Sequence, residues 1–252
     1  MKMSRVQSPI SMAKIIRTEC KFNVNDKIDL NKIIKYYHIK LKRVDNLSEK
    51  TAGASKVRGM DKLIVLNSAY PKMKYQKYES FTIAHEIGHI FLHKGGNICG
   101  PDIFGYRSTA MRENEANEFA SELLLPRVII QNKMKYRDLS IEMGQELSEH
   151  YGISLTASLL ACVKNTTDEV ILLYHSDSNV DWKYSSNDCW LKIDCGLNEN
   201  QTICEAKRVG KFKGSCETRS WFAEDYDIEC QQETIYLKNL QRYLTILNII
   251  RN

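Results

Sequence analysis

Two histidines and a glutamate in the segment FTIAHEIGHIFLH have the spacing of a metal site. His85 and His89 are four residues apart, so on a helix they share one face, and both imidazoles can reach a tetrahedral Zn²⁺ at about 2.0–2.1 Å. Glu86 shares that stripe and can take a proton from a water whose pKa the metal lowers to about 7. The rest of the segment is apolar nearly all round, which is typical of a buried helix. The segment therefore predicts one buried zinc ion with Glu86 as catalytic base.

A third ligand must come from elsewhere, and the segment MRENEANEFASELLLP offers a carboxylate on a second predicted helix. On a helical wheel Glu113 lies nearer than Glu115 to the apolar face, so Glu113 is the favoured ligand. Its alternative role is that of a first-turn acid that interacts favourably with the helix dipole. Asn117, one turn further on, is expected to hydrogen-bond a ligand from outside the metal shell. Glu115, Glu118 and Glu122 are expected on the solvent side.

The remaining histidines fit other roles. His93 follows His85 by eight residues, or about 12 Å of helix axis, so one ion cannot bind both of them together with the histidine between them. His93 is therefore expected at the helix end, supporting a ligand by a hydrogen bond. We interpret His38, His150 and His175 as ordinary surface or core histidines, although His150 precedes a turn where it could stabilise an oxyanion.

The periodicity of the chain indicates which elements position these residues. Residues 29–38 predict a short helix, residues 39–67 two or three strands, and residues 77–93 and 112–125 the two site helices, the second of which ends at Pro126. Residues 138–164 predict two helices joined by a turn at Tyr151 and Gly152, a layout also seen in helix-turn-helix proteins. Strands are predicted at 170–175 and 220–229, and a helix at 237–250.

Composition excludes several classes of protein. With 252 residues, 43% of them hydrophobic and 27% charged, the chain is neither disordered nor fibrous. No apolar run reaches the length of a signal peptide or of the roughly 18 residues that span a bilayer, so we expect a cytoplasmic protein with no membrane partner. The eight cysteines are then expected as reduced thiols. Five of them fall in the last third without a CxxC-like pair, which disfavours a second metal site there.

Charge is unevenly distributed along the chain. Residues 1–80 hold 18 Lys and Arg against 7 Asp and Glu (+11), and the remainder holds 18 against 24 (−6). A basic N-terminal third could face nucleic acid or an acidic partner. Dispersed lysines more often form a solvated helix face, so direct nucleic-acid binding is possible but not favoured.

Together, FTIAHEIGHIFLH and ENEANEFASELLLP resemble the ImmA/IrrE family of zinc metallopeptidases, over roughly residues 17–164. The resemblance implies a zincin-like helical metallopeptidase core with a small sheet, which we assign to residues 1–166 of an α+β protein. A composition shift near Asn165–Asp168 marks the boundary, and the pattern after it predicts a smaller C-terminal α/β module of unknown role over residues 167–252. The resemblance also implies a gluzincin-like site in which His85, His89 and Glu113 bind zinc and Glu86 is the base.

Members of that family typically act on helix-turn-helix repressors, so the implied function is a zinc endopeptidase that relieves repression by cleavage. A different class of function stays open. The chain could be a regulatory protein that keeps the zinc-binding fold but sequesters its partner, or contacts DNA through residues 138–164. A phage or toxin-antitoxin module built on the same core is a third possibility.

Overall fold

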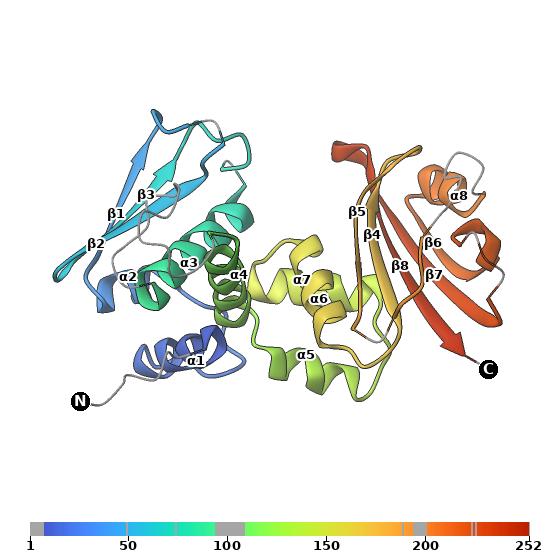
Figure 1. Cartoon of the computed structure of the whole chain (residues 1–252), viewed down its shortest axis with the longest axis horizontal. Helices are drawn as coiled ribbons and strands as arrows, with labels where there is room; N and C mark the ends of the chain where they lie inside the picture. Colours follow the sequence, from blue (N-terminus) through green and yellow to red (C-terminus); the bar gives the residue numbers. More distant parts are fainter. Residues whose placement is uncertain are drawn as a thin grey trace. The chain divides into compact units, whose positions relative to one another are not determined.

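The computed structural model of the chain describes residues 8–48, 50–73, 75–93, 109–187, 189–193, 201–222, 224 and 226–251. Helices and two sheets alternate along this part, which confirms the α+β class (Figure 1). The chain divides into two compact units whose segments alternate along the sequence. Unit 1 comprises residues 1–129 and 149–154, and unit 2 comprises residues 130–148 and 155–252. The boundary near residue 166 stays a prediction of the sequence. In the described part, no helix has the combination of length and apolar character that crossing a membrane requires.

The elements follow in this order. The helices are α1 (Pro9–Glu19), α2 (Leu30–Tyr36), α3 (Gln76–Leu92), α4 (Thr109–Leu124), α5 (Arg127–Met134), α6 (Ile141–Tyr151), α7 (Leu155–Asn165) and α8 (Gln201–Val209). The strands are β1 (Ile39–Val44), β2 (Gly53–Arg58), β3 (Asp61–Asn67), β4 (Val170–His175), β5 (Val180–Ser185), β6 (Lys211–Cys216), β7 (Ile228–Leu237) and β8 (Arg242–Arg251). Short 3₁₀ turns, η2 (Thr218–Ser220) and η3 (Lys238–Leu240), flank β7.

Unit 1 contains a three-stranded sheet in the order β1-β3-β2, with β1 parallel and β2 antiparallel to β3. Helix α3 packs against β2 and β3. Ile64 and Leu66 of β3 are fully buried on the side that faces α3, because side chains alternate between the faces of a strand. The sheet thus supports the helix that carries His85 and His89.

Helices α3 and α4 pack closely because small residues meet where they cross. A Cβ atom at Gly88 would lie 3.2 Å from Ala116 Cα and 2.9 Å from the Phe119 ring. Ala116 and Phe119 are fully buried. A glycine in the middle of a helix costs about 1 kcal/mol relative to alanine, so Gly88 needs a packing reason, and the approach of α4 supplies it.

Arg17 of α1 is buried and fixes the end of α4. Its Nη1 donates to the carbonyl of Leu123 at 2.7 Å, and its Nη2 donates to the carbonyls of three residues in the loop after α1: Asn23, Val24 and Asp26. Burial lowers the pKa of this guanidinium, but the nearby Tyr151 and Asp26 oppose the shift. The Leu123 carbonyl at the C-terminus of α4 therefore finds a donor inside the protein, as helix ends require.

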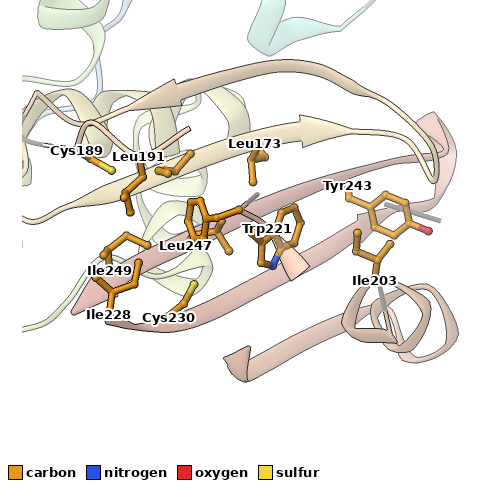
Figure 2. Close-up of a cluster of buried hydrophobic side chains, with 12 residues drawn as sticks. Leu173, Cys189, Leu191, Ile203, Trp221, Ile228, Cys230, Tyr243, Leu247 and Ile249 are labelled. Atoms are coloured by element: carbon orange, nitrogen blue, oxygen red, sulfur yellow. The ribbon is translucent and has the colours of Figure 1, made fainter. Parts of the chain in front are cut away.

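Unit 2 is built on a five-stranded antiparallel sheet in the order β5-β4-β8-β7-β6. An apolar cluster covers one of its faces, and Figure 2 shows Trp221 near its centre between Leu173 and Leu247, with Tyr243 and Ile203 together at one end. Helix α8, which carries Ile203, packs over this side against β6 and β7. These residues are buried, so the cluster is the hydrophobic core of the module.

A chain of buried hydrogen bonds crosses the same sheet. His175 donates from Nδ1 to the carbonyl of the next residue at 2.9 Å, so its Nε2 accepts from the Thr245 hydroxyl at 2.9 Å. Thr234 donates to Thr245 at 2.9 Å, and Gln232 Nε2 donates to Thr234 at 2.8 Å. Trp221 Nε1 closes the chain by donating to Gln232 Oε1 at 2.9 Å. Every polar side chain in the series has a partner, as burial demands.

Several predictions for the C-terminal module are wrong. Residues 237–250, predicted as a helix, form η3 and strand β8. Strand β8 is buried on both faces, so its apolar residues run almost without interruption and hide the two-residue period. The segment 220–229 is not a strand either, because β7 begins only at Ile228. The strand at 170–175 and the two helices after residue 138 are confirmed.

Candidate metal site

Three electron-pair donors from two helices converge on one point in unit 1. His85 Nε2 and His89 Nε2 of α3 lie 3.0 Å apart. The Glu113 carboxylate of α4 lies 3.2 Å from His85 Nε2 and 3.3 Å from His89 Nε2. In the described part of the chain this trio forms a group whose ligand atoms could hold a metal ion. The interhelix contact at Gly88 brings the two sides of the site together.

Hydrogen bonds orient the first imidazole. The His85 Nδ1–H group donates to Asn117 Oδ1 at 2.9 Å, since that amide oxygen can only accept. His85 Nε2 is then left with a lone pair directed at the site. Asn117 is itself exposed, so it orients the ligand from the rim of α4.

A second chain orients His89. His93 Nε2–H donates to Glu115 Oε2 at 2.9 Å, which leaves His93 Nδ1 to accept from His89 Nδ1–H at 2.9 Å. Both histidines are buried. Burial lowers the pKa of His93 although Glu115 opposes the shift, so this ring stays neutral and keeps its acceptor. His89 Nε2 therefore also faces the site as a lone pair.

The chemistry of this donor set fits a divalent cation. Two imidazole lone pairs and a carboxylate face one another here. Without a positive charge between them, these electron-rich groups would repel one another. Without a metal, a proton on His85 supplies that charge: burial lowers its pKa, but the hydrogen bond with Glu113, the charges of Glu86 and Glu113 and the hydrogen bond with Asn117 together raise it. Hydrogen bonds with His85 and His89 hold the pKa of Glu113 well below its usual range. Ligands at about 2.0–2.1 Å in a tetrahedron stand roughly 3.3 Å apart, which the 3.0–3.3 Å separations match.

Glu86 lies beside the donors on the same helix, pressed against strand β2. A Cβ atom at Gly53 would stand 2.9 Å from Thr82 Cγ2 and 3.2 Å from Glu86 Oε1, so only glycine at the start of β2 leaves room for this carboxylate. Glu86 is 3% exposed. Burial raises its pKa, and the neighbouring His85 opposes the shift. A carboxyl group held in this way can both accept and return a proton near neutral pH.

A cleft of about 250 Å³ opens onto these residues. Its walls come from the start of β2 with the residues before it, and from α3 and α4. His85, Glu86, Glu113 and Asn117 line it on the helical side, and Tyr78 and Phe81 extend it along α3. Strand β2 is an edge strand of the sheet that the structure describes, and Gly53 at its start lines the cleft.

The structure brings together His85, Glu86, His89, His93, Glu113 and Asn117 but not His150, and two expectations for α4 are wrong. Glu115 does not lie on the solvent side, because it bonds His93 and its side chain is only 18% exposed. Glu122 is buried and accepts hydrogen bonds from the backbone N–H and Nε of Arg127. The helical wheel missed both because it ignores partners from other elements. His150 is exposed and contacts the Asn25 carbonyl.

Two glycines that shape the site were also overlooked in the sequence. Gly88 admits α4, and Gly53 admits Glu86. The signal for Gly88 is its position in the middle of an otherwise strong helix, where glycine is unfavourable. No comparable signal marks Gly53, because glycine is common in the turn-rich stretch before a strand.

The α+β fold thus combines an HExxH helix, a glutamate from the following helix and an adjoining cleft, so two histidines and one carboxylate form a candidate metal site. The family comparison is specific: residues 35–161 match the Peptidase M78 family, described as the IrrE N-terminal-like domain, and the chain belongs to this family. No curated protein matches the sequence.

Among solved structures, a Mycobacterium tuberculosis transcriptional regulator is similar in fold. The alignment has a TM-score of 0.59 and 12% sequence identity, and it covers 95% of this chain and 74% of the regulator. At that identity the likeness shows a shared fold over nearly the whole chain, and nothing about activity.

Proposed function

We propose that this chain is a zinc-dependent endopeptidase of the cytoplasm that cleaves a helix-turn-helix transcriptional repressor. The observation that carries the proposal is the convergence of His85 Nε2, His89 Nε2 and the Glu113 carboxylate beside the buried Glu86. Membership of the Peptidase M78 family supports hydrolysis of a peptide bond. The described cysteines are free thiols, in keeping with a reducing compartment.

In this proposal His85, His89 and Glu113 hold one zinc ion. When bound, zinc would act as a Lewis acid, polarising the scissile carbonyl and making a water acidic near neutral pH. Glu86 accepts a proton from the attacking water as the new carbon–oxygen bond forms, and returns it to the amide nitrogen as the carbon–nitrogen bond breaks. Its raised pKa suits both halves of this transfer.

The cleft supports a peptide substrate. An extended chain can lie beside the edge strand β2 and hydrogen-bond its backbone, a common way to bind peptides. A target that regulates transcription is supported by the family and by the fold shared with a transcriptional regulator.

The test separates cleavage from binding. The purified protein, loaded with one equivalent of zinc, is incubated with candidate helix-turn-helix repressors, and the fragments are identified by mass spectrometry. We expect fragments from the wild type, none after chelation, and a loss of 10²–10⁴-fold in rate for Glu86→Gln. Glu149→Gln, an exposed glutamate in α6, is the matched control.

The alternative, regulation by binding without cleavage, is tested on the same variants by measuring zinc content and the expression of a repressed reporter gene. Zinc content is measured in each variant, because Glu86→Gln should keep the metal. If Glu86→Gln retains zinc and still relieves repression at the wild-type level, the chain acts by binding its partner and the endopeptidase proposal is wrong.

A further inference from the structure

The three-stranded sheet of unit 1 has one face without a helix in the described part of the chain. Helix α3 packs on one side, as its contacts with β2 and β3 and the ion pair between Arg43 of β1 and Glu79 show. Figure 1 shows the labelled helices of unit 1 away from the opposite side of the strands. We call that opposite side the outer face; it comprises Lys40 and Lys42 of β1, Ala54, Lys56 and Arg58 of β2, and Asp61, Leu63 and Val65 of β3.

The outer face is basic and largely uncompensated. Lys40, Lys42, Lys56 and Arg58 are exposed on it, against the single acid Asp61. Asp61 pairs with Lys40 at 3.2 Å, so three positive charges have no ionic partner among the described residues. The outer face thus carries a net charge of +3 (four cations and one acid), part of the excess of +11 in residues 1–80.

An apolar strip runs between the two rows of charge. The register places Leu63 between Lys40 and Lys56, and it places Val65 between Lys42 and Ala54. Leu63, Val65 and Ala54 are only partly buried. Adjacent strands are about 4.8 Å apart, so the basic rows on β1 and β2 are separated by about 10 Å, close to the diameter of an α-helix.

The strip continues to an exposed methionine. Met60, in the turn between β2 and β3, is 89% exposed and follows Arg58 by two residues. An unbranched, polarisable side chain that is left in solvent is common at protein-binding surfaces. A single partner can therefore contact the apolar strip and the basic side chains of the outer face at the same time.

We propose that the outer face docks an acidic amphipathic helix of a protein partner. Such a helix sets its apolar stripe on Leu63 and Val65 and presents carboxylates to Lys42 and Lys56 on its two flanks. Nucleic acid is disfavoured, because phosphates would lie against the apolar strip and the face has no aromatic side chain for base stacking. The proposal goes beyond the endopeptidase function and does not depend on it, since it concerns binding alone.

The test measures binding of a defined probe to the full chain. The probe is a fluorescent 18-residue helical peptide with leucines at helical spacing and glutamates on both flanks, and its control replaces each glutamate with lysine. Fluorescence anisotropy at low salt should show micromolar binding of the acidic peptide only. Lys42→Glu combined with Lys56→Glu should weaken it at least tenfold, and Leu63→Ser should weaken it in the same direction.

A charge-matched control separates the outer face from net charge. Lys14→Glu combined with Lys35→Glu makes the same change on exposed positions of α1 and α2. Circular dichroism verifies that all variants are folded. Equal weakening by both pairs, no binding of the acidic peptide, or binding of a 20-base-pair DNA duplex that the Lys42 and Lys56 changes abolish would each overturn the proposal.

Discussion

The contact between α3 and α4 at Gly88 leads to a quantitative prediction for Gly88→Ala. The added methyl group would stand 3.2 Å from Ala116 Cα and 2.9 Å from Phe119 Cδ1. Carbon atoms in ordinary contact are about 3.5–4.0 Å apart, so α4 must move away from α3 by roughly half an ångström. The Phe119 ring can rotate, but the backbone of Ala116 cannot yield without moving the helix.

The expected cost has two opposing parts. Overpacking a core costs about 1–3 kcal/mol, and alanine gains about 0.8–1.0 kcal/mol over glycine in a helix. The net loss of unfolding free energy without metal is therefore about 0–2 kcal/mol. Zinc binding is more sensitive than the unfolding free energy to this shift, because Glu113 lies one turn before Ala116 on α4 and moves with it. A metal site tolerates distance errors of about 0.2 Å.

We therefore expect Gly88→Ala to lower zinc affinity at least tenfold, measured by competition with a chromophoric chelator. Under saturating zinc this removes at least about 1.4 kcal/mol of the stabilisation that the metal confers, visible as a smaller rise of the melting temperature. Asn114→Ala, on the exposed side of α4, is the control. Wild-type zinc affinity in Gly88→Ala would refute the idea that this contact sets the distance between the donors.

Three further changes test other parts of the structure. Glu115→Gln, which weakens the acceptor for His93, should reduce zinc affinity 10–100-fold in the same chelator assay, while Glu118→Gln should leave it unchanged. Burial lowers the pKa of His175, so below about pH 6.5 the unfolded chain binds more protons than the folded one, and the stability of unit 2 should fall on acidification by at most about 1.4 kcal/mol per pH unit. Urea unfolding followed by tryptophan fluorescence measures this stability, because all three tryptophans lie in unit 2. In His175→Gln the His175 contribution to this pH dependence should be absent. Arg17→Met leaves four backbone carbonyls without their donor and should lower the unfolding free energy by roughly 3–5 kcal/mol in calorimetry, whereas an unchanged value would show that water replaces the guanidinium.

Local patterns were sufficient for the elements whose partners lie near in sequence. The helix of the HExxH motif could be predicted because its period is complete within its own residues, and the strands β1 and β3 because alternation and apolar runs are local. Strand β2 lies in the stretch 51–60, whose small and turn-forming residues indicate turns instead. Strand β8 could not be predicted, because both of its faces are covered by segments distant in the chain. An apolar run of that length satisfies the requirements of a helix and of a central strand equally well.

The amino-acid sequence by itself determines that the side chains of His85 and His89 lie on one face of a helix, because a four-residue spacing on any α-helix aligns two side chains. Which other groups complete and orient the site was decided by the tertiary structure alone. Glu113 and Glu115 are two residues apart on α4 and point in different directions; the packing at Gly88 turns the first toward the imidazoles and the second toward His93. A helix fixes the angle between its own side chains, but only the contact with a neighbouring helix fixes what each of them meets.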